Sequence, residues 1–190
     1  MINQTIKIGG CILMLTLGFS LPAAAEKFTV DSESYVAFKV EHAVGLNTGV
    51  INKMTGSINV DKNTGQIQEI TLEGDVNSLN SFYGRRDELL KSDKFFDAAK
   101  YPTVTLRLFV TKDNKKRAEL TVKGVTKSIP IMARLVGFRS SSSGAEEAQV
   151  NLTGYFNRAD FGMDHNVAGE DGQPILGEEI EFFISVHGKK

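Results

Sequence analysis

The sequence predicts an all-β protein, an eight-stranded antiparallel barrel with one short helical insertion between the third and fourth strands. Eight stretches alternate apolar and polar side chains with a period of two, as strands with one buried face do. Only residues 80–101 are rich in helix formers and charges. Gly56, Gly74 and Gly154 fall in the inward register, where glycine permits the bending that closure of a sheet needs.

The chain begins with the features of a cleavable export signal. Lys7 is the only charged residue in this part, and an apolar run covers residues 8–21 before the small residues 23–25. The run is short for a membrane-spanning helix, which needs about 20 apolar residues. We therefore expect residues 1–25 to be a signal peptide and residues 26–190 to be one domain, exported to the periplasm or, as a second choice, secreted.

Charge and cysteine content narrow the possible functions. The 190 residues include 22 basic and 23 acidic side chains, and this balance argues against binding to nucleic acid. Cys11 is the only cysteine and lies in the predicted signal peptide, so packing rather than disulfides would stabilise the exported domain. No second apolar segment is long enough to insert stably into a membrane.

The eight predicted strands follow one another in chain order. They cover residues 36–40, 54–60, 70–76, 104–110, 118–122, 129–135, 148–156 and 180–186. In the first strand Val36, Phe38 and Val40 face inward, whereas Tyr35 and Lys39 face outward. Each strand has one apolar face, and these faces must meet across a shared interior. Eight strands enclose a space that side chains fill or that holds one small ligand.

The helical segment, residues 80–101, interrupts the strand pattern. Ser92 can cap a turn within it, and Pro102 ends it. Its apolar residues are Leu89, Leu90, Phe95 and Phe96. They either plug one end of the barrel or form a lid over a functional opening, and a plug can serve as a lid.

The inward positions carry almost no charge, so they offer apolar surface and no acid, base or nucleophile. Each buried methylene contributes about 0.8 kcal/mol, so ten carbons contribute on the order of 8 kcal/mol before ordering costs. A long-chain amphiphile is therefore the expected ligand, and a barrel packed solid with its own side chains is the alternative. Small inward residues favour a cavity: Gly56, Gly74, Ala118, Ala133, Ala148 and Gly154.

The predicted ligand contacts combine inward apolar residues with two polar residues near the barrel ends. They are Phe38, Val40, His42, Met54, Arg86, Phe95, Phe96, Leu106, Leu120, Phe156 and Phe182. His42 continues the inward register of the first strand and should lie at a mouth. Arg86 can bind a phosphate or amide head group. Alternatively, Arg86 and Asp87 pair with partners that hold the helix against the barrel.

An enzyme is the main alternative class of function, and no motif supports it. The exported part contains no G-x-S-x-G motif of the kind that presents a serine nucleophile. His42, His165 and His187 lie far apart without metal-ligand spacing. We therefore expect no catalytic residue, metal site or cofactor.

Several blocks occur in a fixed order along the exported part of the chain. They comprise residues 31–34, 38–42, 76–79, 86–87, 90–97, 101–102, 120–127, 158–163 and 177–180. Together they resemble the YceI-like family of polyisoprenoid-binding proteins. The resemblance spans the exported part of the chain and implies a lipocalin-like barrel. It further implies a non-enzymatic protein that holds an isoprenoid or similar amphiphile for transport, storage or sequestration.

Relatives that pair as dimers also suggest a homodimer here, with a lateral contact through outward aromatic residues: Tyr35, Phe109, Tyr155 and Phe183.

The chain departs from the family pattern at Leu89, where histidine is common, and at Ser128, where proline is common. The first departure removes a polar group from the helical segment. Without tryptophan, the chain also lacks the Gly-x-Trp signature of true lipocalins. Two further alternatives remain, an envelope interaction module with a solid barrel and a scavenger of lipophilic toxins.

Overall fold

The computed structural model describes residues 25–141, 144–170 and 172–190. The predicted signal peptide, residues 1–25, lies outside the described residues except for Ala25. No helix in the described ranges is long and apolar enough to cross a membrane.

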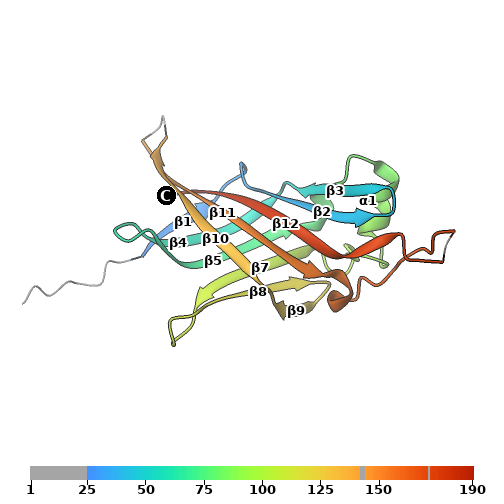
Figure 1. Ribbon diagram of the computed structural model, residues 1–190. Coiled ribbons are helices and arrows are strands. Elements are labelled where there is room, and N and C mark those ends of the chain that lie inside the picture. The colour runs from blue at the N-terminus through green and yellow to red at the C-terminus, as the bar shows by residue number, and fades with distance from the viewer. Residues whose placement is uncertain (1–24, 142–143, 171) are drawn as a thin grey trace, which may run out of the picture.

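Strands dominate the described part of the chain (Figure 1). In order, the elements are β1 (Glu26–Val30), β2 (Tyr35–His42), β3 (Gly45–Ile51), β4 (Met54–Asp61), β5 (Gln66–Asp75), the 3-10 helix η1 (Val76–Ser78), β6 (Leu79–Asn80), α1 (Gly84–Lys91), β7 (Thr103–Val110), β8 (Lys116–Val122), β9 (Val125–Ser128), β10 (Ile131–Ser140), β11 (Glu146–Asn157), η2 (Arg158–Phe161) and β12 (Leu176–Lys189). The chain is therefore all-β with one α-helix in its described part, and α1 falls within the segment predicted to be helical.

The predicted count of eight strands is wrong, because twelve strands are described. The eight alternating stretches correspond to β2, β4, β5, β7, β8, β10, β11 and β12, whereas β1, β3, β6 and β9 were not predicted. These four strands show little of the alternation of apolar and polar residues that identifies a strand in a sequence. All four residues of β9 are exposed, β6 has two residues, and β3 contains two glycines within GLNTGVI.

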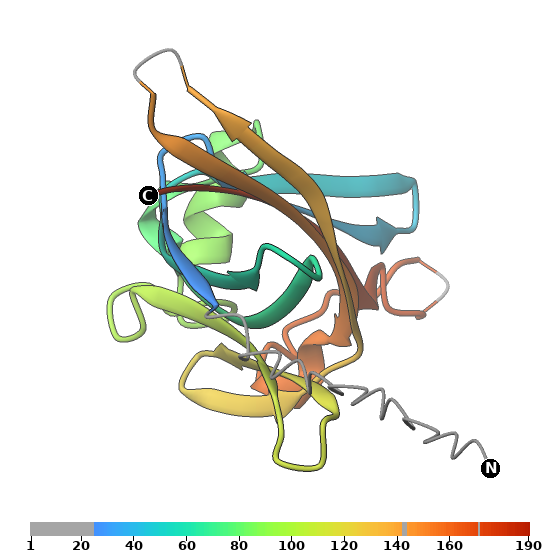
Figure 2. The same cartoon turned by 90° about the vertical axis from the view of Figure 1, so that its left-hand side faces the viewer.

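The twelve strands form one antiparallel sheet that is open rather than a closed barrel. The hydrogen-bonded order is β6-β3-β2-β12-β1-β4-β5-β7-β8-β9, and β11 joins β12 to β10. Within the described ranges no ladder joins β10 to β9 or β8. The sheet nevertheless curls around a common interior (Figure 2). Near the unpaired edge, the Ile129 amide donates to the Ala118 carbonyl over 3.1 Å.

Three strand paths are interrupted, two near their middles and one near its end, and these breaks explain part of the miscount. β12 pairs with β2 along Leu176–Ser185 and with β1 at Gly188 and Lys189, so β1 and β2 follow one another along the same neighbour. At the interruption, buried Ser34 replaces ladder bonds. Its hydroxyl accepts from the His187 amide over 2.9 Å and lies 3.1 Å from the His187 carbonyl, to which it can donate.

The other two interruptions lie beside each other, between β3 and β4 and between β5 and β6. Asp75 caps η1 by accepting a hydrogen bond from the Asn77 amide over 2.9 Å. The Ser78 hydroxyl donates to the Asp75 carbonyl over 2.7 Å and accepts from the Lys53 amide over 3.1 Å. Capping of this kind satisfies backbone groups that the ladders leave unpaired.

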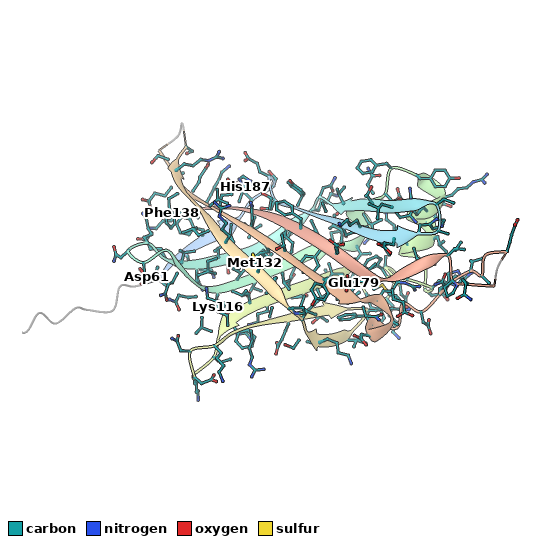
Figure 3. All side chains as sticks on the ribbon, in the orientation of Figure 1. Asp61, Lys116, Met132, Phe138, Glu179 and His187 are labelled. Carbon is teal, nitrogen blue, oxygen red and sulfur yellow. The ribbon has the colours of Figure 1, made fainter. Side chains whose placement is uncertain are left out.

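One half of the interior is packed solid. It is formed by buried residues from β1, β4, β5, β7, β11 and β12: Phe28, Ile58, Val60, Ile67, Ile70, Leu108, Val150, Leu152 and Val186. Figure 3 labels Asp61, Phe138 and His187 near this end of the molecule. The backbones approach closely at Gly56, which has φ +144°, and a Cβ there would lie 2.0 Å from the Thr71 carbonyl oxygen.

Candidate functional site: an apolar cavity with a polar mouth

The other half of the interior contains a cavity of about 550 Å³. All eleven residues predicted from the sequence as ligand contacts line it: Phe38, Val40, His42, Met54, Arg86, Phe95, Phe96, Leu106, Leu120, Phe156 and Phe182. The interior is therefore neither solid throughout nor hollow throughout. It has a packed half and a half that can accept a ligand.

The floor of the cavity is aliphatic. Leu72, Leu106 and Leu120 come from β5, β7 and β8 and lie across from one another in register, with Leu106 pairing with both neighbours. Met54 of β4 completes this surface, and all four side chains are buried. Because alternate residues of each strand face the same side, the period-two pattern brings these residues to one surface.

Aromatic side chains form much of the wall. The Phe156 ring lies 5.2 Å from Phe161 in an edge-on arrangement and 6.3 Å from Phe182, measured between ring centroids. Phe182 pairs in register with Phe38 of β2 and Gly154 of β11. A Cβ on Gly154 would lie 2.6 Å from the Phe182 ring and 2.8 Å from the Pro130 carbonyl oxygen, so glycine makes room for both groups.

The small inward residues were expected to create the cavity, and only one of the six borders it. Gly74 lines the cavity, whereas Gly56, Ala118, Ala133, Ala148 and Gly154 do not. Ala118 and Ala148 are packed into the core instead. Residue size along single strands therefore did not reveal where the cavity lies, because the lining comes from several strands and from segments outside the strands.

The helical segment covers one end of the cavity. Leu89, Leu90, Phe95 and Phe96 all line the cavity. Leu89 remains 39% exposed, whereas Phe95 is buried with its ring 5.6 Å from that of His165. Ser92 ends α1, and its hydroxyl donates to the Leu89 carbonyl over 2.7 Å. The segment thus lies between solvent and the apolar interior.

Arg86 and Asp87 hold α1 in place, as the alternative interpretation of this pair required. The Arg86 guanidinium donates to the Asn47 side chain on β3, to the Ser81 hydroxyl over 3.1 Å and to the Ser81 carbonyl over 3.2 Å. The Asp87 carboxylate accepts from the Ser81 amide over 2.6 Å and from the Ser81 hydroxyl. Burial alone would raise the pKa of Asp87, but these hydrogen bonds, with Lys91 and Arg86 nearby, lower it.

Arg85 differs from Arg86 in having no partner of this kind. It is exposed and lines the cavity mouth, and within the described ranges no hydrogen bond or ion pair involves its side chain. His42 lies at the same mouth, as predicted, where its Nδ1 is 3.4 Å from the Val44 amide. The two residues offer polar groups at the end of an apolar cavity.

Arg158 is the site residue of most consequence that sequence reasoning missed. It lines the cavity and is 3% exposed. Its guanidinium donates to four backbone carbonyls, those of Gly177 (2.8 Å), His165 (3.0 Å), Leu176 (3.4 Å) and Met163. Burial lowers the pKa of Arg158, while Glu178 and Asp164 act in the opposite direction. Arginine remains charged at such sites, so Arg158 is a buried cation that shapes the loop before β12.

That loop, residues 163–175, contributes several other lining residues that the sequence analysis did not identify. It supplies Met163, His165, Asn166, Val167 and Ile175. The loop has no periodicity, so apolar patterning could not detect it. Its only sequence signal was the block at residues 158–163. Among the described residues, no group of three or more histidine, cysteine, aspartate or glutamate side chains is placed to hold a metal.

The family of the chain follows from comparison with known protein families. A model of the YceI-like domain matches residues 28–187. The chain belongs to the YceI-like family. A UPF0312 protein of Enterobacter sp. (strain 638) is 28% identical over 188 residues, which cover 93% of this chain and 91% of the relative.

Solved structures of YceI-like proteins share the fold. The Campylobacter jejuni YceI protein matches with a TM-score of 0.62 and 25% identity, over 75% of this chain and 84% of that chain. A polyisoprenoid binding domain from Saccharophagus degradans matches with a TM-score of 0.63 and 16% identity, over 85% of this chain and 97% of that chain. At the lower identity, the likeness shows the fold alone.

Proposed function

We propose that this YceI-like protein binds an isoprenoid or another long-chain amphiphile in its cavity, without catalysing a reaction. The observation that carries the proposal is the cavity itself, whose floor is aliphatic, whose wall is aromatic and whose inner end meets a solid core. The polyisoprenoid binding domain of Saccharophagus degradans shares this fold and supports the choice of ligand. The proposed setting is the periplasm, where the protein would transport, store or sequester an oily molecule.

The volume of the cavity sets the length of tail that it holds. Liquid water fills about 30 Å³ per molecule, so the cavity has room for roughly 18 groups of that size. A methylene occupies a similar volume, and a tail of about 15 carbons would contribute roughly 12 kcal/mol through burial. Micromolar affinity requires about 8 kcal/mol, which leaves about 4 kcal/mol to offset ordering of the ligand.

The polar head of such a ligand would lie at the mouth. Arg86 uses its donors to hold α1 and is poorly placed to serve a ligand as well. Arg85 and His42 also line the cavity at its mouth, and a guanidinium can bind phosphate, carboxylate or carbonyl oxygens. We therefore assign the head-group contact to the Arg85 and His42 side of the mouth.

Ligand binding is tested by titrating delipidated protein with farnesol, whose fifteen carbons match the cavity, using displacement of the apolar fluorophore N-phenyl-1-naphthylamine. Phe38→Asp places a carboxylate in the cavity wall and should weaken binding of the fluorophore roughly a hundredfold. Ala37→Asp is the matched control, because Ala37 is the next residue of β2 and borders the outer face of the sheet. Circular dichroism checks that both variants fold.

Two results would contradict the proposal. One is a wild-type protein that binds neither compound and carries no lipid when weighed intact after purification from its host. The other is an equal loss of binding in both variants. A scavenger is recognised in the same titration by similar affinity for chemically unrelated lipophilic compounds, whereas a dedicated carrier prefers one class.

Homodimer formation is a further proposal, and the outer groove supports it. Tyr155 and Phe183 border a groove of about 760 Å³ on the outer face of β2, β3, β10, β11 and β12, and the Tyr35 ring lies 6.2 Å from that of Phe183. Phe109 does not belong to this surface, because it lies on β7 beneath Arg107. Sedimentation velocity should show dimers that Tyr155→Lys weakens. A monomer at every concentration would contradict this proposal.

A further inference from the structure

Exposed apolar side chains gather around the opening of the cavity. We define the mouth rim as Val44, Leu46, Tyr83, Leu89 and Val167. Their exposed fractions are 91%, 60%, 56%, 39% and 54%. They come from three segments that are distant in sequence, namely the β2–β3 hairpin, the helical segment and the loop before β12. Such a grouping of apolar side chains on a surface typically marks an interaction site.

Hydrogen bonds show that the three segments form one continuous edge. The Ala43 amide donates to the Ile175 carbonyl over 2.9 Å, and the Ile175 amide donates to the Val167 carbonyl over 3.0 Å, which joins the hairpin to the loop. The hairpin is joined to α1 where the Arg86 guanidinium donates to the Asn47 side chain. In Figure 1 the tip of β2 and β3, α1 and the loop before β12 lie at the same end of the molecule.

The mouth rim is continuous with the cavity. Tyr83, Leu89 and Val167 are exposed to solvent and also line the cavity, so the cavity opens between α1 and the loop. A ligand tail that enters there passes directly from the surroundings of these side chains to the aliphatic floor. A tail can therefore enter the cavity without crossing water when the assembly that it leaves contacts the mouth rim.

We propose that the mouth rim docks on the surface of a lipid bilayer, and that ligand tails pass between the bilayer and the cavity there. This inference rests on the proposed function. A tail that leaves a bilayer through water exposes every methylene, whereas docking keeps the tail in apolar surroundings throughout. We choose a bilayer as the docking partner because the exposed apolar side chains of three segments surround the opening of an apolar cavity.

The chemistry of the rim suits the boundary between acyl chains and head groups. Val44 and Leu46 project from a hairpin tip and can enter the acyl region, while Tyr83 combines an apolar ring with a hydroxyl that favours the interface. Arg85 lines the cavity mouth, has no hydrogen-bond or ion-pair partner among the described residues, and can contact lipid phosphates. Glu88 on the same helix offsets this charge, so apolar contact must supply most of the docking.

Vesicle sedimentation tests the docking. The wild-type protein is mixed with vesicles of phosphatidylethanolamine and phosphatidylglycerol in a ratio of about three to one. It should sediment with the vesicles, and the double variant Val44→Asp, Leu46→Asp should lose at least about tenfold in partition. Met132→Asp is the matched control, because Met132 is 72% exposed on the outer face of β10 and lies outside the mouth rim. This control should bind within about twofold of the wild type.

Fluorophore binding in solution separates this proposal from the proposed function. The double variant should keep its affinity for N-phenyl-1-naphthylamine, because neither Val44 nor Leu46 lines the cavity. Wild-type protein that ignores the vesicles would overturn docking on a bilayer and leave a protein partner for the mouth rim. An equal loss in the Met132 variant would overturn it in favour of the outer groove. Vesicle binding by wild-type protein that fails to bind the fluorophore would instead count against the proposed function.

Discussion

Replacing Arg158 by methionine should destabilise the loop that forms one side of the cavity mouth. Methionine is similar in length and apolar, so the substitution removes the donors and the charge with little change in volume. Four carbonyls, those of Met163, His165, Leu176 and Gly177, would lose the hydrogen bonds that the guanidinium now donates. Since Arg158 is 3% exposed, water cannot replace these bonds unless the loop opens.

The number and kind of lost hydrogen bonds set the expected decrease in the free energy of unfolding. A hydrogen bond from a charged donor contributes roughly 1.5–3 kcal/mol, so four independent bonds would give about 6–12 kcal/mol. The bonds share one side chain and are not additive, and an opened loop regains water. Burying the guanidinium also costs free energy, as its lowered pKa indicates. We therefore expect the free energy of unfolding to fall by about 3–5 kcal/mol.

Urea unfolding followed by circular dichroism measures this loss, and hydrogen exchange locates it. Exchange should quicken in residues 163–177 before it quickens in β1 and β4, which belong to the packed half of the interior. Arg158→Lys keeps a charge and up to three donors, so its stability should lie between those of the wild type and the methionine variant. A methionine variant within about 1 kcal/mol of the wild type, with unchanged exchange in the loop, would refute the reasoning.

Two further predictions concern stability. Asp87→Asn should lower the free energy of unfolding by about 1–2 kcal/mol at pH 7. Because the folded-state pKa of Asp87 is lowered, the stability it confers is present above the ordinary value of 3.8 and is lost as pH falls through the folded value, so the two proteins should converge in acid. A constant difference across an acid titration of urea midpoints would contradict this. Gly56→Ala should cost about 3 kcal/mol or more, because its Cβ would lie 2.0 Å from the Thr71 carbonyl oxygen at φ +144°. Gly137→Ala is the control, since a Cβ there meets nothing within 4 Å, and equal midpoints for both variants would show that Thr71 moves aside.

The sequence alone determined which side chains face the interior. Alternation along β2, β7 and β8 placed Phe38, Leu106 and Leu120 on the inner surface, and all three line the cavity. The alternation could not identify β9, whose four residues are exposed, or β3, which contains two glycines. Nor could it establish closure of the sheet, because the pairing of β10 depends on distant backbone groups rather than on its own pattern.

The tertiary structure decided what each polar residue at the mouth does. Arg85 and Arg86 are neighbours of the same type, yet Arg86 reaches Asn47 and Ser81 while Arg85 lies at the opening. Arg158 gave no signal beyond its family block, because its partners are backbone carbonyls whose positions depend on how the loop folds. Apolar register is a local property of the chain, since successive strand residues must point to opposite faces. The location of the cavity is not local, because its lining comes from distant strands, the helical segment and the loop before β12.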